Sequence, residues 1–227
     1  MRWRGLTTLA LLAGLAVPAM AQDARPGIAV LPFDNGGSYG QDKENFEALS
    51  IGLQQMLTTE FAANPALRVV DRSQIKQLLS EQDLGAAGRV DANTAAKIGK
   101  LVGAKYMIQG GFVDFYGDFR LDLRIINVET SEIVKTEKAR DKRENLYNMV
   151  TTVAVALTKG VNFPVLSKQV MDMRENRKVP TEAVTYYSRA LLYADRGNKE
   201  KAKELFSRAI EIFPDYSEAK QGLQQVS

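Results

Sequence analysis

The side chains that most often perform catalysis are sparse in this sequence. Its 227 residues include no histidine and no cysteine, which excludes histidine-dependent triads, histidine-ligated metal sites and thiol chemistry in this chain. Two pairs of carboxylates are closely spaced in the sequence. Glu44 and Glu47 are related as i and i+3, and Asp114 and Asp118 as i and i+4. A hydrolase that uses two carboxylates is therefore one alternative, although surface acids commonly show the same spacing.

Two further patterns invite a ligand-binding interpretation. Asp114, Asp118 and Asp122 could be imagined as cation ligands, but the residue order of a calcium-binding loop is absent. The glycine-rich segment 34–40 lacks both the GxGxxG spacing and the Gly-Lys-Ser/Thr ending of a phosphate-binding loop. We therefore predict no metal, no cofactor and no catalytic residue, and we expect a protein that is not an enzyme.

The N-terminal residues have the pattern of an export signal. Two arginines precede an apolar run from Leu6 to Pro18, and residues 19–21 form a small-x-small cleavage pattern. We predict a signal peptide over 1–21, cleavage between Ala21 and Gln22, and a periplasmic location. An uncleaved anchor helix is the alternative, but the apolar run is shorter than the roughly 20 residues that a membrane span needs. Without cysteine, we also expect no lipoprotein anchor.

The charge pattern argues against a nucleic-acid partner. The chain has 30 Lys+Arg against 27 Asp+Glu, and both signs are interspersed along it rather than concentrated in one basic block. Loss of the signal peptide would lower the formal charge of +3 to about +1. We expect no nucleic acid and no integral membrane insertion, because no later segment is long and apolar enough to cross a bilayer as a helix.

The mature chain alternates strand-like and helix-like segments, which predicts an α/β domain. An apolar strand at 104–113 follows a helix that Asp91 caps and Gly103 ends, since glycine tolerates the positive φ of a helix C-terminus. We predict a mixed sheet of about five strands covered by helices. The expected strands are 27–33, 67–70, 104–113, 120–128 and 132–138, and the expected helices are 42–63, one after Asp71, 91–102 and 144–161.

Several motifs recur in the order found in a known family. They are Ile28-Ala29-Val30-Leu31-Pro32-Phe33, Val69-Val70-Asp71-Arg72, the stretch Gly103 to Gly110 and the stretch Leu123 to Ile133. Over about 26–161 the chain resembles the curli production assembly and transport family (CsgG-like), and it is similar to the N-terminal domain of the translocation protein TolB. The resemblance implies an α/β fold of the cell envelope.

The outer-membrane channel of that family carries long hairpins that this sequence lacks. The connection from Phe112 to Leu121 is short, and residues 140–145 join the last strand to the last helix directly. The resemblance therefore implies the soluble periplasmic core of the family rather than its channel. A ring-forming component of a curli-type export assembly stays the runner-up.

The C-terminal part has the pattern of a tetratricopeptide repeat over Ala183 to Tyr216, followed by a capping helix from Ser217 to Val226. We predict a linker over 163–180 and this helical hairpin over 181–227, after an α/β domain over 22–162. Because one repeat seldom stands alone, we expect it to pack on the first domain or to be completed by another chain. The predicted partner-binding residues are Tyr186, Ala190, Tyr193, Ala202, Phe206 and Ala209.

We conclude that the sequence predicts a non-catalytic interaction or assembly factor of the envelope, which binds other envelope proteins through the hairpin and the α/β domain and could form a homo-oligomer. The alternatives are the ring-forming export component and the carboxylate-dependent hydrolase.

Overall fold

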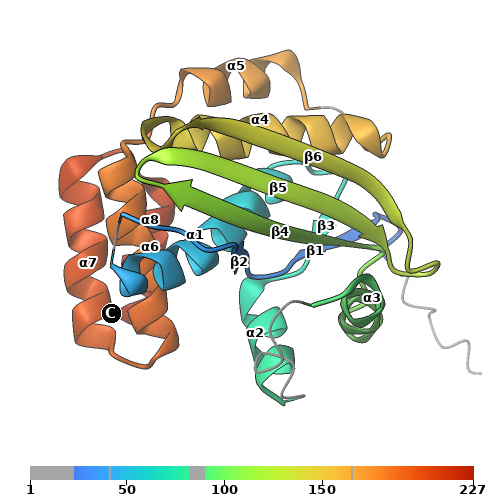
Figure 1. The fold of residues 1–227 in the computed structure, drawn as a ribbon, viewed down its shortest axis with the longest axis horizontal. Coiled ribbons are helices and arrows are strands. Elements are labelled where there is room, and N and C mark those ends of the chain that lie inside the picture. The colour runs from blue at the N-terminus through green and yellow to red at the C-terminus, as the bar shows by residue number, and fades with distance from the viewer. Residues whose placement is uncertain (1–22, 41, 82–89, 165) are drawn as a thin grey trace, which may run out of the picture.

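The computed structural model describes residues 23–40, 42–81, 90–164 and 166–227. The predicted signal peptide and its predicted cleavage site lie outside these residues. Figure 1 shows one twisted sheet with helices on both faces and three C-terminal helices, coloured orange to red, standing beside one end of it. The fold is thus α/β followed by a helical tail, as predicted.

Among the described residues the sheet is mixed and has the order β3-β1-β4-β5-β6, with a short strand β2 pairing with β4. β1 runs parallel to both β3 and β4, whereas β4, β5 and β6 form an antiparallel meander. The prediction of about five strands missed only the two-residue β2. The strands are β1 (Gly27–Val30), β2 (Asp34–Asn35), β3 (Arg68–Val69), β4 (Tyr106–Phe115), β5 (Asp118–Asn127) and β6 (Ile133–Lys142).

The helices follow the predicted positions closely, and for the helix at 92–101 the flanking residues explain where it starts and ends. The Asp91 carboxylate accepts a hydrogen bond of 2.7 Å from the Thr94 amide, and Gly103 has φ +64° after α3. The described helices are α1 (Lys43–Ala62), α2 (Arg72–Glu81), α3 (Ala92–Leu101), the 3₁₀ turn η1 (Arg143–Asn145), α4 (Leu146–Gly160), α5 (Lys168–Asn176), α6 (Thr181–Asp195), α7 (Lys199–Ile212) and α8 (Ser217–Val226). Of these described helices, none has the length and apolar character needed to cross a membrane.

One face of the sheet is covered by α1 and α4. The apolar stripe of α1 is buried along its whole length, from Phe46 to Phe61, and packs on strand residues such as Ile108 and Phe112. The same hydrophobic cluster continues into α6, α7 and α8 without a break. The sheet domain and the tail therefore share one core.

The opposite face is covered at one end only. α2 and α3 pack on β1 and the start of β4, where Ile75, Ile98 and Met107 are fully buried. Figure 1 shows both helices on the same side of the sheet, below the β1 and β4 labels. Farther along β5 and β6 the side chains of this face reach solvent. This uncovered part is called the open face below.

The segment predicted as a linker over 163–180 contains the helix α5, so that prediction was incomplete. The Ser167 hydroxyl caps the helix by accepting a hydrogen bond from the Val170 amide. The Arg174 guanidinium binds both the backbone oxygen and the carboxylate of Glu60 in α1, at 2.6 and 3.1 Å. The polar composition of this segment concealed a short helix that is held down by charge rather than by an apolar stripe.

Candidate interaction surfaces

The predicted partner-binding residues of the tail fall into two groups. Ala190, Ala202, Phe206 and Ala209 are at most 1% exposed. The small side chains let α6 and α7 approach closely, and the Phe206 ring packs against Tyr187 with 5.9 Å between ring centroids. Those four residues hold the hairpin together and cannot contact a partner directly, which corrects their predicted role.

The other two predicted residues reach the surface. Tyr186 and Tyr193 are half-buried on α6. The hydroxyl of Tyr193 donates to the Glu44 carboxylate of α1 at 3.1 Å, so this tyrosine lies at the junction between tail and sheet domain. Tyr186 therefore remains a predicted partner-binding residue.

The tail packs on the first domain through α1 and α6, which was one of the two predicted arrangements. The helices meet at Gly52 and Ser188, where a methyl group added to Gly52 would lie 2.7 Å from the Cβ of Ser188. Only glycine permits such an approach. The side of α6 that faces α1 is consequently filled by this chain itself.

Charged contacts surround this junction. Arg72 of α2 binds Asp195 of α6 with an N–O distance of 2.5 Å, and the Lys76 ammonium donates to the Asp195 backbone oxygen at 2.8 Å. Glu44 and Glu47, the first carboxylate pair considered for catalysis, bind Arg189 and Arg196 at 2.9 and 2.6 Å. Arg189 lies in α6 and Arg196 directly follows it, so each carboxylate is bound to an arginine rather than to the other carboxylate. Their position indicates a role in holding the tail.

A second anchor lies at the opposite end of the tail. The Arg177 guanidinium forms a two-pronged ion pair with Glu218 of α8, with distances of 2.7 and 2.5 Å, and it donates to the Tyr147 hydroxyl at 3.0 Å. Its charge also lies over the rings of Tyr147 and Tyr216. Burial opposes ionisation of Glu218, but the hydrogen bond and charge of Arg177 outweigh it and lower the pKa of that carboxyl.

The second surface is the open face, which the sequence analysis did not identify. Opposed positions of β5 and β6 point to the same side and carry five cations and two carboxylates. Gly111 and Val113 of β4 border the face and line a hollow of about 340 Å³ together with Gln109 and Arg124. The Arg124 guanidinium donates directly to the Gln109 side-chain oxygen at 2.9 Å. The charged residues are Arg120, Arg124, Lys138, Arg140, Lys142, Asp118 and Asp122.

The three aspartates considered as a cation site are each bound to an arginine. Asp114 is fully buried and pairs with Arg143 at 2.8 Å, while Asp118 pairs with Arg140 and Asp122 with Arg120. The hydrogen bond from Arg140 lowers the pKa of Asp118. In the part of the chain that the structure describes, no group of three acidic residues is arranged to hold a metal ion.

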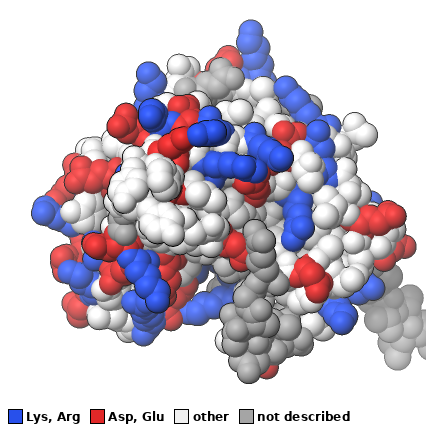
Figure 2. Space-filling model, in the orientation of Figure 1, with Lys and Arg blue, Asp and Glu red and all other residues white. Residues whose placement is uncertain are grey.

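Three aromatic rings stand at the end of the β4–β5 hairpin and are called the aromatic tip. Tyr39, Phe115 and Tyr116 are 59%, 59% and 72% exposed, and neighbouring rings meet edge to face with centroid distances of 6.0 and 5.1 Å. In Figure 2 a white area lies at this end of the sheet, beside a group of blue side chains. The sequence analysis placed Phe115 and Tyr116 in the short connection between Phe112 and Leu121, and nothing in the sequence indicated that Tyr39 joins them.

Comparison with known proteins supports both parts of the predicted architecture. The family described as curli production assembly/transport component CsgG matches residues 15–120, from the predicted signal segment to the start of β5. This match is shorter than the predicted extent of the resemblance, so most of β5, β6 and α4 lie beyond it. The tetratricopeptide repeat family matches residues 183–216, the same bounds as predicted. No curated protein matches the chain.

Solved structures with related folds are distant. The C-terminal domain of LpoB from Escherichia coli is 20% identical, with 55% of this chain and 87% of that chain covered and a TM-score of 0.41. TolB from Acinetobacter baumannii is 13% identical, with 62% and 28% covered and a TM-score of 0.38. On the two family matches, the chain carries a CsgG-like domain followed by one tetratricopeptide repeat.

Proposed function

We propose that this protein is a non-catalytic interaction factor of the cell envelope, exported to the periplasm and binding a protein partner through the outer surface of its tail. The observation that carries the proposal is the rigid attachment of a tetratricopeptide hairpin to a CsgG-like domain. Ion pairs from Arg72, Arg189 and Arg196 fix α6 against α1 and α2. A surface that is fixed before binding loses little conformational entropy when a partner arrives.

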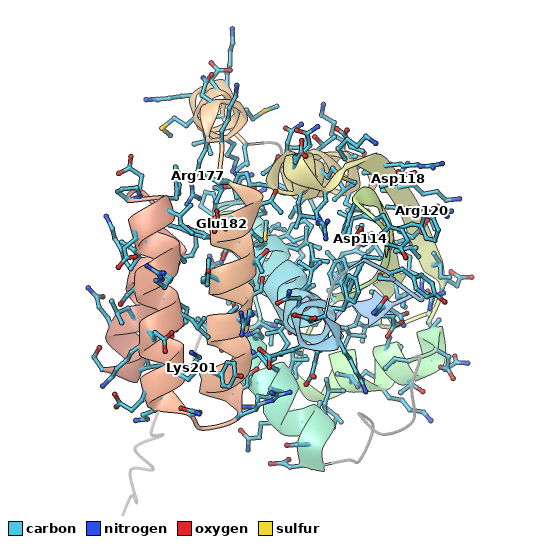
Figure 3. All side chains as sticks on the ribbon, turned by 60° about the vertical axis from the view of Figure 1, so that its left-hand side comes forward. Asp114, Asp118, Arg120, Arg177, Glu182 and Lys201 are labelled. Atoms are coloured by element: carbon cyan, nitrogen blue, oxygen red, sulfur yellow. The ribbon has the colours of Figure 1, made fainter. Side chains whose placement is uncertain are left out.

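The available part of the tail is the side of α7 and α8 that faces away from α1. It is polar and charged, with Lys199, Glu200 and Arg208 exposed on α7 and Lys220 exposed on α8. Figure 3 shows α6 and α7 side by side, with Lys201 and Glu182 at opposite ends of the pair. Such a surface suits a partner that is itself polar and charged, with an interface that excludes water from only a small apolar area.

Deleting the tail would not test this proposal cleanly. Removal of residues 180–227 would expose the side of α1 around Gly52 and leave Glu44 and Glu47 without their arginines, so loss of binding could follow from unfolding. Point changes on the outer surface avoid this difficulty because they leave the shared core intact.

The test places a photoreactive amino acid at Arg208 on α7 and, as a control, at Lys97 on α3, followed by crosslinking in intact cells. We expect a discrete protein adduct at position 208 that is absent at position 97. Equal adducts at both positions, or none at position 208, would contradict the proposal. Mass spectrometry of the exported protein would show whether it starts at Gln22.

A homo-oligomer is the second candidate, and β6 is the feature that favours it. In the sheet order of the described residues, β6 is an edge strand of ten residues, so the backbone groups on its outer side have no strand beside them. Lys138 and Lys142 on this strand discourage open-ended pairing. Light scattering of the purified protein tests this candidate, since a closed ring would give one large species of fixed mass, whereas a monomer would give the mass of a single chain.

A further inference from the structure

The aromatic tip is built to hold apolar rings in solvent. Tyr116 and Gly117 form the two-residue turn of the hairpin with φ values of +53° and +93°. Asparagine, aspartate and glycine are the residues that such a turn favours, whereas a tyrosine with positive φ is disfavoured. A tyrosine in this position therefore suggests that its side chain, and not the turn geometry, determines the residue type.

Buried and backbone contacts brace the tip from behind. The fully buried Asp114 accepts a hydrogen bond of 2.8 Å from the Gly117 amide and forms an ion pair with Arg143. Tyr39 is joined to the hairpin by two backbone hydrogen bonds. Its amide donates to the backbone oxygen of Asp114 at 2.7 Å, and its backbone oxygen accepts from the Tyr116 amide at 3.2 Å. Two loops far apart in sequence thus present their rings on one rigid support. Figure 3 shows Asp114 beneath the end of the hairpin, with Asp118 and Arg120 nearby.

Cations lie directly behind the rings. Arg120, Arg140 and Lys142 occupy the positions of the open face nearest the turn, and Lys138 follows on the same side. Asp118 and Asp122 neutralise two of the five cations of the open face, whereas no ion pair to Lys138 or Lys142 is found within the described residues. The surface adjoining the aromatic tip thus carries a net positive charge, which complements an anionic partner.

The shape and chemistry fit a lipid surface better than a protein groove. The rings project from the end of a hairpin, so they can enter the interfacial region of a bilayer while the basic open face stays outside it. Tyrosine is enriched where membranes meet water, and lysine and arginine beside the contact are attracted to anionic lipid headgroups. We propose that the aromatic tip and its adjoining cations dock this protein peripherally on an anionic membrane surface.

The test is sedimentation of the exported full-length protein with vesicles of phosphatidylcholine alone or with roughly one-third phosphatidylglycerol. We expect binding to the anionic vesicles only, weakened by added salt. Phe115→Ser should reduce the partition coefficient about tenfold, and Lys142→Gln should reduce it about fivefold at low salt. Tyr116→Asn, which suits the positive φ, provides a variant that keeps the turn.

Matched control variants distinguish binding through the aromatic tip from nonspecific binding through any exposed apolar or cationic side chain. Leu101 in α3 is as exposed as Phe115, and Lys100 in α3 is exposed like Lys142, so Leu101→Ser and Lys100→Gln should leave binding unchanged. A Phe115→Trp variant gives an independent signal, because the single tryptophan of the sequence, Trp3, lies in the predicted signal peptide. Its fluorescence should shift to shorter wavelength with anionic vesicles.

Three outcomes would overturn the proposal: no vesicle binding by the unaltered protein, equal binding to neutral vesicles, or unchanged binding by the tip variants. If a photoreactive group at position 115 captured a protein while the vesicles bound nothing, the tip would be a protein contact instead. None of these results bears on crosslinking at Arg208, so the failure of this proposal is distinguishable from failure of the proposed function.

Discussion

Gly52 of α1 and Ser188 of α6 approach so closely that a Cβ on Gly52 would lie 2.7 Å from the Cβ of Ser188. Gly52→Ala should destabilise the protein by about 1–3 kcal/mol, because the clash outweighs the better helix propensity of alanine. Urea unfolding measures the change. Adding Ser188→Gly should restore much of the loss, and a double variant no more stable than Gly52→Ala would refute the contact.

The Arg72–Asp195 contact should contribute to holding the tail. Both side chains are mostly buried, and Asp195 also accepts from Lys76, so Asp195→Ala leaves two cations without their partner. We expect a loss of about 1–3 kcal/mol in unfolding free energy. Glu204→Ala serves as the control, since it breaks the exposed pair with Lys201 and should leave the unfolding midpoint unchanged. Similar effects from both changes would contradict this interpretation.

Glu60 should make stability depend on pH in the acidic range. Burial raises the pKa of its carboxyl above the ordinary value of 4.5, and the charge of Arg174 offsets this only in part. The folded state therefore binds the proton more tightly than the unfolded state. This contribution is complete below pH 4.5 and is lost as pH rises through the folded-state pKa.

Comparison with Glu60→Gln isolates that contribution, because glutamine does not titrate. As pH rises from about 4 to 8, the unfolding free energy of the unaltered protein should fall relative to that of the variant. Urea titrations of both proteins at each pH measure the difference. Parallel curves across the range would exclude Glu60 as the titrating group.

The two buried tyrosines at the tail should respond oppositely to loss of their hydroxyl groups. The Tyr216 hydroxyl is buried and has no hydrogen-bond partner among the described residues, so Tyr216→Phe should be neutral or slightly stabilising. The Tyr147 hydroxyl accepts from Arg177, and Tyr147→Phe should cost about 0.5–1.5 kcal/mol. Thermal unfolding of the two variants compares them. A larger loss for Tyr216→Phe would contradict the assignment.

The fold was largely predictable because its signals are local. Each of these signals involves residues that are close together in the sequence. They include the apolar stripe from Phe46 to Phe61, the helix cap at Asp91 and the helix-ending glycine at position 103. The helix α5 was missed because Arg174 holds it through Glu60, a residue more than a hundred positions earlier. A contact of that kind leaves no periodic pattern in the sequence.

The candidate surfaces were less predictable for a similar reason. Tetratricopeptide positions are defined by packing, so the residues that identify the repeat, such as Ala190 and Phe206, are interior residues. The aromatic tip depends on a backbone pairing between Tyr39 and Phe115, two segments that only the parallel alignment of β2 with β4 brings together. No local pattern in the sequence links those two segments.

The shared core of α1 and α6 constrains when folding can finish. Glu44 and its partner Arg189 are 145 residues apart in the chain, and the side of α1 near Gly52 stays apolar and unsheltered until the last quarter of the polypeptide arrives. A chain that ends before α6 therefore cannot complete its core, and the domain closes only once its C-terminal helices have been synthesised.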